Sequence, residues 1–121
     1  KFARDTNIDA MAISVGNVHL KQNRDGLLDE TLIKEIDERT DLPLVIHGGS
    51  GVPIAQRQHL ARHSSICKFN IGTELRLVFG SALRNAVNDE PKLFDRIEFL
   101  KKTHDPVKSA AQNVIRTLYT R

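Results

Sequence analysis

Scarce and missing features set the first limits on what this 121-residue chain can be. The single cysteine, Cys67, cannot close a disulfide within the chain, which excludes a disulfide-stapled scaffold and predicts a cytoplasmic location. No apolar run approaches the length of a membrane span, and we expect no signal peptide because KFARDTNIDA lacks an apolar segment. The net charge of +3 comes without a dense basic stripe, so we expect neither nucleic acid nor a membrane as partner.

The overall composition is that of a folded globular domain. Charged residues make up 27% of the chain and hydrophobic residues 40%, which is enough apolar material for a core. No Pro/Ser-rich linker and no low-complexity tract divide the sequence. Because the chain begins at a lysine and moves quickly into an apolar run, we expect it to be part of a longer polypeptide.

Three apolar runs have the character of β-strands. They are IDAMAISVGNVH (8–19), PLVIH (43–47) and the shorter, more mixed ICKFN (66–70). The first two runs end in a histidine and the third in an asparagine. The ends fall about one strand–helix unit apart, which is typical of parallel strands joined by crossover helices.

A helical segment follows each of these runs. Residues 29–40 place apolar side chains on one face, with Asp29 as the expected N-cap. Residues 53–64 begin with Pro53, which is favoured in the first turn of a helix, and residues 73–87 carry a clear apolar stripe. From residue 91 onward, the sequence predicts two helices broken at Asp105–Pro106.

The predicted architecture is an α/β fold with a parallel sheet. Three parallel strands alone would leave two open sheet edges, and a complete (β/α)8 TIM barrel needs roughly 250 residues. We therefore expect residues 1–88 to form the last three βα units of such a barrel. Residues 89–121 would form a helical extension that packs on the barrel or on a second subunit. A doubly wound sheet is the alternative that the pattern leaves open.

Polar residues stand at the end of each predicted strand, which is where proteins with parallel sheets carry their functional residues. His19 and His47 could bind one metal from neighbouring strands, and zinc is the metal that such histidine sites usually hold. A catalytic zinc generally takes three protein ligands, and these are only two. The alternative is that each histidine is a structural residue.

Glycine-rich loops follow two of the strands. HGGSG (47–51) surrounds Ser50 with glycines, and Gly72 and Thr73 lead directly from a strand into a helix. Glycine lets backbone N–H groups approach an anion closely, and the helix N-terminus adds a positive dipole. Two such junctions in adjacent units indicate a phosphate site, whereas tight turns without a ligand are the alternative.

Other reactive side chains have plainer interpretations. Lys68 shares the alternation of Asn70 and could face inward, where it could form a Schiff base or pair with a carboxylate. Cys67 has the opposite alternation and is expected to pack against a helix. His59 and His63 stand four residues apart on a predicted outer helix, where an exposed polar face is the favoured interpretation.

The segments GNVHL, PLVIHGGSGVP and KFNIGTELR, in this order and spacing, resemble the C-terminal half of class II, metal-dependent fructose-bisphosphate and tagatose-bisphosphate aldolases. The resemblance extends over nearly the whole chain. It implies a zinc-dependent aldolase that cleaves a ketose bisphosphate to dihydroxyacetone phosphate and an aldehyde. It also implies a homo-oligomer, a dimer or tetramer, with a sugar phosphate as the small-molecule partner. Another divalent metal and a monovalent cation remain open.

The resemblance assigns roles to individual residues. By it, His19 and His47 are two of the three zinc ligands, and Asn70 is a catalytic residue that hydrogen-bonds the substrate near the metal. The residues that would hold phosphate or substrate are Gly48, Ser50, Asn70, Gly72 and Thr73.

Two features separate this chain from a complete member of that family. The third histidine ligand and the catalytic aspartate belong to the N-terminal half of the family, which lies outside this sequence. Leu20 stands where many members have a glycine, which leaves the phosphate geometry and the substrate open. The alternative function is a non-catalytic half-barrel that binds phosphate ligands or assembles with another chain.

Overall fold

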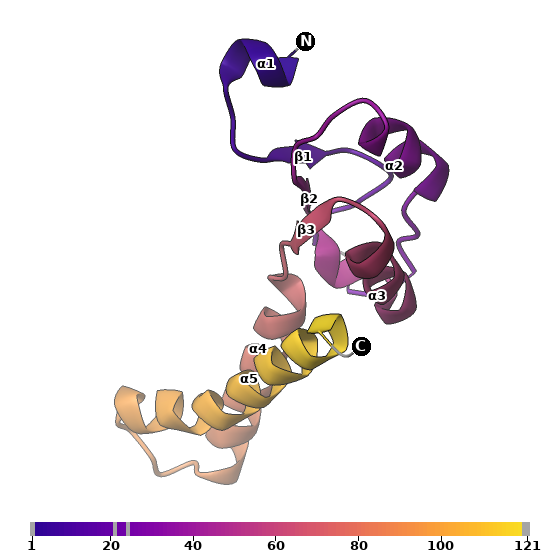
Figure 1. The fold of residues 1–121 in the computed structure, drawn as a ribbon. Helices are drawn as coiled ribbons and strands as arrows, with labels where there is room; N and C mark the ends of the chain where they lie inside the picture. The colour runs from indigo at the N-terminus through magenta and orange to yellow at the C-terminus, as the bar shows by residue number, and fades with distance from the viewer. Residues whose placement is uncertain (1, 21, 24, 120–121) are drawn as a thin grey trace. The chain divides into compact units, whose positions relative to one another are not determined.

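The computed structural model describes residues 2–20, 22–23 and 25–119 (Figure 1). The chain forms two compact units, Lys1–Gly72 and Thr73–Arg121, each of which is described by itself. The expected grouping of residues 73–88 with the barrel stays a prediction.

The first unit is an α/β layer built on a parallel sheet, as the sequence predicts. The strand order is β1-β2-β3, and both neighbouring pairs run parallel. Figure 1 shows α2 and α3 on the same side of this sheet. The elements are α1 (Phe2–Thr6), β1 (Met11–Ile13), α2 (Glu30–Asp37), β2 (Leu44–Ile46), the 3₁₀ turn η1 (Gly49–Gly51), α3 (Ile54–His63) and β3 (Ile66–Phe69).

The core lies between the helices and one face of the sheet. Leu44 and Ile46 of β2 are fully buried and belong to the same cluster as Ile33 of α2 and Leu60 of α3. Val45, between the two strand residues, is buried but is not part of that cluster. Because side chains alternate along a strand, Val45 points to the face of the sheet opposite α2 and α3.

A β-bulge interrupts the pairing of the last two strands. Leu44 pairs with Ile66, and Val45 pairs with Lys68, so Cys67 is an extra residue without a partner in the ladder. The extra residue shifts the alternation of β3, because Ile66 shares the face of Leu44 while Lys68 shares the face of Val45. The prediction that Cys67 packs against a helix is therefore wrong. The residue is exposed, and its thiol lies 3.5 Å from the carbonyl oxygen of Leu44.

The helix starts follow the sequence signals closely. The Asp29 side chain caps α2 by accepting a 2.9 Å hydrogen bond from the N–H of Leu32. Pro53 is the N-cap residue of α3, which begins at the next residue. β1 is much shorter than the predicted run 8–19, because the chain leaves the sheet after Ile13 and turns through Gly16 at a φ of 92°.

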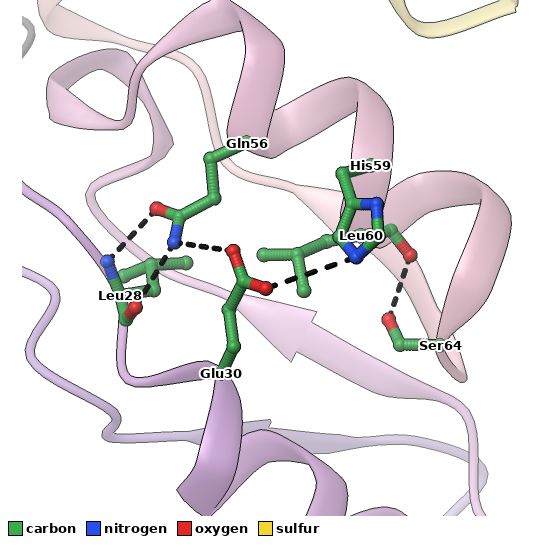
Figure 2. A network of polar contacts seen from close by, with 6 residues as sticks. All are labelled: Leu28, Glu30, Gln56, His59, Leu60 and Ser64. Carbon is green, nitrogen blue, oxygen red and sulfur yellow. Dashed lines mark hydrogen bonds and ion pairs between the residues drawn. The ribbon is translucent and has the colours of Figure 1, made fainter.

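A polar network ties the start of α2 to α3 (Figure 2). The Gln56 carboxamide accepts from the N–H of Leu28 at 2.9 Å and donates to its carbonyl oxygen at 3.0 Å. It also donates to Glu30, whose second oxygen lies 3.7 Å from His59 Nε2. His59 and His63 are exposed, as the sequence predicts for an outer polar face.

The second unit is a helical hairpin of α4 (Thr73–Asp89) and α5 (Arg96–Tyr119), which Figure 1 shows side by side. The predicted break at Asp105–Pro106 is wrong, because α5 runs through Pro106 without ending. Proline removes one backbone donor, and tertiary packing outweighs that loss here. Ala86 of α4 and Thr103 and Val114 of α5 are buried.

The hairpin also carries apolar side chains that this chain leaves exposed. They include Phe94, Ile97, Leu100 and Ile115, and Phe94 is 94% exposed. Across residues 2–20, 22–23 and 25–119, no helix combines the length and apolar character needed to cross a bilayer.

Candidate active site

The ends of β1 and β2 bring the two predicted metal ligands together. His47 directly follows β2, and His19 reaches the same place from the loop that follows β1. Their ring centroids lie 5.6 Å apart, with the planes inclined by 44°. Both side chains are exposed. The two loops therefore bring the imidazoles to one place, and their role as metal ligands stays a prediction.

Asn70, at the end of β3, joins this pair. Its side-chain nitrogen lies 3.2 Å from Nδ1 of His47. Its backbone is equally fixed, because the Asn70 N–H donates to Ile46 and the Asn70 carbonyl accepts from the N–H of Gly49. The ends of all three strands thus contribute to one cluster, and His47 stands at its centre.

Gly48 allows the loops after β1 and β2 to approach. It adopts a φ of 66°, a left-handed conformation that favours glycine. A Cβ atom at this position would lie 2.6 Å from the carbonyl oxygen of Val18, well inside van der Waals contact. The glycine is therefore required by the backbone that carries His19 past His47.

The second and third loops are joined through Ser50. The Gly72 N–H donates to Ser50 Oγ at 3.2 Å, and the serine is only 7% exposed. This contact brings together two residues that the resemblance assigns to phosphate binding. Thr73 opens α4 and belongs to the second unit, so its expected role in phosphate binding stays a prediction.

Leu20 holds a backbone conformation that L-residues rarely adopt. Its φ is 59°, and its side chain is exposed, so packing of the side chain does not offset the backbone strain. The sequence resemblance marks this position as one where many relatives have glycine. The conformation gives the physical reason, because glycine takes a positive φ without steric cost.

Asn17 is a site residue that the sequence analysis missed. Its Oδ1 accepts a 2.9 Å hydrogen bond from the N–H of Val15, and its Nδ2 donates at 3.0 Å to the carbonyl of His47. The residue lies inside the quoted segment GNVHL, two positions before His19. The sequence signal that could have identified Asn17 was its place in the loop between a strand and the candidate ligand His19.

Lys68 lies on the face of the sheet opposite α2 and α3. It pairs with Val45, which points away from the helices, and the lysine itself is exposed. This is the face that would become the interior if the sheet closed into a barrel.

The described residues fit part of a metal centre. Among them, no three histidine, cysteine, aspartate or glutamate side chains are grouped so that they could hold a metal ion. His19 and His47 supply two nitrogen donors of the kind that zinc prefers. Completion of the centre requires at least one ligand from outside this part of the chain.

Comparison with known proteins now identifies the family. The sequence profile described as "Fructose-bisphosphate aldolase class-II" matches residues 1–121. This chain belongs to the class II fructose-bisphosphate aldolase family. Membership confirms the resemblance carried by GNVHL, PLVIHGGSGVP and KFNIGTELR.

A solved structure supports the same assignment. The YdjI aldolase from Escherichia coli K12 matches with a TM-score of 0.73 and 25% sequence identity. The match covers 98% of this class II aldolase-family chain and 42% of YdjI. The chain therefore spans less than half the length of that relative. The likeness supports an α/β fold with a parallel sheet and helices.

Proposed function

We propose that this chain is the C-terminal portion of a zinc-dependent aldolase that cleaves a ketose bisphosphate to dihydroxyacetone phosphate and an aldehyde. In this proposal residues 1–88 are the last three βα units of a (β/α)8 barrel, and the remaining helices pack on the barrel or on a second subunit. Family membership supports lyase chemistry in general, and the arrangement of the strand ends supports the particular site.

His19 and His47 are the proposed zinc ligands, with a third histidine contributed by the N-terminal half. When bound, zinc supplies a Lewis acid that draws electron density from the substrate's ketone oxygen. The contact of Asn70 with Nδ1 of His47 restricts the orientation of that ring. Another divalent metal could serve in place of zinc, and a monovalent cation could act as a further cofactor.

The two glycine loops are proposed to hold the phosphate end of the substrate. Gly48 and Ser50 belong to the loop after β2, and Gly72 and Thr73 stand after β3. The backbone hydrogen bond from Gly49 to Asn70 couples these loops at 3.1 Å. Binding the phosphate there would place the reacting carbons beside the histidine pair and would reduce the entropy cost of alignment.

One observation carries the proposal. Two imidazoles from the loops that follow adjacent parallel strands lie at a centroid distance of 5.6 Å, directly beside two coupled glycine loops. A site for metal alone would not need the second loop, and a phosphate site alone would not need the paired imidazoles. A ketose phosphate has both a polarisable carbonyl and a phosphate.

The test is aldol cleavage by the complete protein with fructose 1,6-bisphosphate and tagatose 1,6-bisphosphate as substrates. We expect a chelator to abolish cleavage and added zinc to restore it, while Lys68→Ala keeps its activity. Cleavage that survives the chelator and leaves a borohydride-trapped adduct on Lys68 would instead establish the Schiff-base mechanism and overturn the proposal.

A non-catalytic half-barrel is the second candidate, and the number of ligands favours it for the isolated chain. Among the described residues, no third metal-binding side chain joins the His19–His47 pair. Zinc titration of the complete protein separates the two candidates, because a two-histidine site binds weakly and loses zinc to chelators, whereas a complete site retains it. Tight, chelator-resistant binding by the complete protein would exclude the non-catalytic half-barrel, and weak binding would exclude the complete zinc site.

Assembly and location complete the proposal. The exposed apolar side chains of the α4–α5 hairpin support packing against the barrel or another copy in a dimer or tetramer. A cytoplasmic location is proposed from the single cysteine.

A further inference from the structure

The Asn17 side chain is a bridge between the two loops that carry the histidines. Its Oδ1 accepts a hydrogen bond from the N–H of Val15, and its Nδ2 donates one to the carbonyl of His47. Val15 is 1% exposed, and its own carbonyl accepts from Asp29 at the start of α2. The Asn17 side chain therefore connects the buried backbone of Val15 to the backbone of His47.

The Asn17 side chain lies where the loops that carry His19 and His47 come close to each other. Gly48, the residue after His47, lies so near Val18 that the two loops pack backbone against backbone. Backbone contact of this kind is sensitive to small displacements, because no flexible side chain can absorb them. The hydrogen bond to the His47 carbonyl fixes the second loop at the position where His19 meets His47.

We propose that Asn17 is a positioning residue that holds the spacing at which His19 and His47 can bind the same metal ion. This inference rests on the proposed metal centre. Asn17 itself reaches His47 only through the backbone carbonyl and need not contact the ion. Outer residues that orient metal ligands typically change metal affinity about 10- to 100-fold when they are removed.

The test uses the complete protein, freed of metal and titrated with Co²⁺, whose visible absorption reports the coordination geometry. We expect Asn17→Ala to weaken Co²⁺ binding about 10- to 100-fold and to change the shape of the absorption band. Asn17→Ser isolates the bridge, because its hydroxyl could accept from Val15 but is too short to reach His47. We expect Asn17→Ser to weaken Co²⁺ binding nearly as much as Asn17→Ala does.

Gln56→Ala is the matched control. Gln56 is also a carboxamide that hydrogen-bonds the backbone of a distant segment through both of its ends, but both backbone partners are at Leu28, in the α2–α3 network (Figure 2). We expect Gln56→Ala to lower the melting temperature while Co²⁺ affinity and absorption stay at wild-type values. A loss of affinity that merely follows the loss of stability in both variants would overturn the positioning role.

The outcomes separate this inference from the proposed function. Wild-type affinity and absorption in Asn17→Ala would overturn the role of Asn17 and leave the metal centre standing. A wild-type protein that binds no Co²⁺, or binds it unchanged after His47→Ala, would overturn the metal centre and this inference with it.

Discussion

The side-chain nitrogen of Asn70 lies 3.2 Å from Nδ1 of His47, so the end of β3 directly contacts the candidate metal ligand at the end of β2. The contact occupies one of the two nitrogen atoms of the imidazole. It thereby fixes the ring and leaves Nε2 as the nitrogen that Asn70 does not contact. Asn70, which is proposed to contact the substrate, therefore also holds the proposed metal ligand His47 in place.

Substitution of Asn70 tests that link. We expect Asn70→Ala to weaken zinc binding about 10- to 100-fold, because the His47 ring loses the group that orients it. Asn70→Asp replaces the contacting nitrogen with an oxygen. That oxygen can accept from Nδ1–H, the tautomer that a ring takes when its Nε2 binds zinc, so the zinc affinity should fall less. Zinc titration of both variants in the complete protein checks this order. Equal zinc affinity in wild type and Asn70→Ala would show that the contact does not support the ligand.

Gly48→Ala tests the close approach of the first two loops. A methyl group would meet the carbonyl of Val18 at 2.6 Å, in a backbone conformation with a φ of 66°. We expect a loss of about 1–3 kcal/mol in the free energy of unfolding from the conformation alone, measured by urea denaturation. Gly80→Ala is the control, because that helical position meets only the flexible Arg84 side chain, at 3.4 Å. It should be neutral or stabilising, and the same loss in both variants would contradict the account.

Leu20→Gly should stabilise the protein. The substitution removes a left-handed conformation that costs a non-glycine residue about 1–2 kcal/mol, and the side chain is 72% exposed, so little burial is lost. Part of the gain is offset by the greater flexibility of glycine in the unfolded chain. A rise in melting temperature checks the prediction. Leu27→Gly, at a similarly exposed leucine without a positive φ, should give no rise.

The α4–α5 hairpin should show a stability change at alkaline pH. A hydrogen bond to the Glu90 carboxylate, together with its charge, raises the pKa of Lys102 above its ordinary 10.5. The contribution is therefore fully present below pH 10.5 and is lost as the pH rises through the higher folded-state pKa. The stabilities of wild type and Glu90→Gln should differ below pH 10.5 and converge as the pH rises through the folded-state pKa of Lys102. Because both groups are partly exposed, added salt should reduce the difference. A difference that persists at high pH would exclude Lys102 as its source.

The sequence predicts the parts of the fold that depend on local patterns. Apolar runs separated by helical segments indicate the parallel sheet, and Asp29 marks the start of α2 through its capping side chain. The order of the strand ends also predicts that His19 and His47 meet. These features follow from periodicity, capping and the fixed direction of parallel strands, all of which are visible in a single sequence.

The failures arise where tertiary contacts decide the local structure. α5 continues through Pro106 because both halves of the helix belong to one packed hairpin, and no local signal reports that packing. The extra residue at Cys67 changes which side chains of β3 face the core, and alternation alone does not reveal such a bulge. Asn17 was missed for a related reason, since its partner His47 is 30 positions away.

The most direct measurement of the central claim is the zinc content of the complete purified protein and three histidine variants. We predict stoichiometric zinc in wild type and in His63→Ala, whose histidine is exposed on α3 away from the strand ends. His19→Ala and His47→Ala should lose zinc and aldol cleavage together while remaining folded. Full zinc occupancy and turnover in both of those variants would contradict the assignment of this strand-end pair as the metal site.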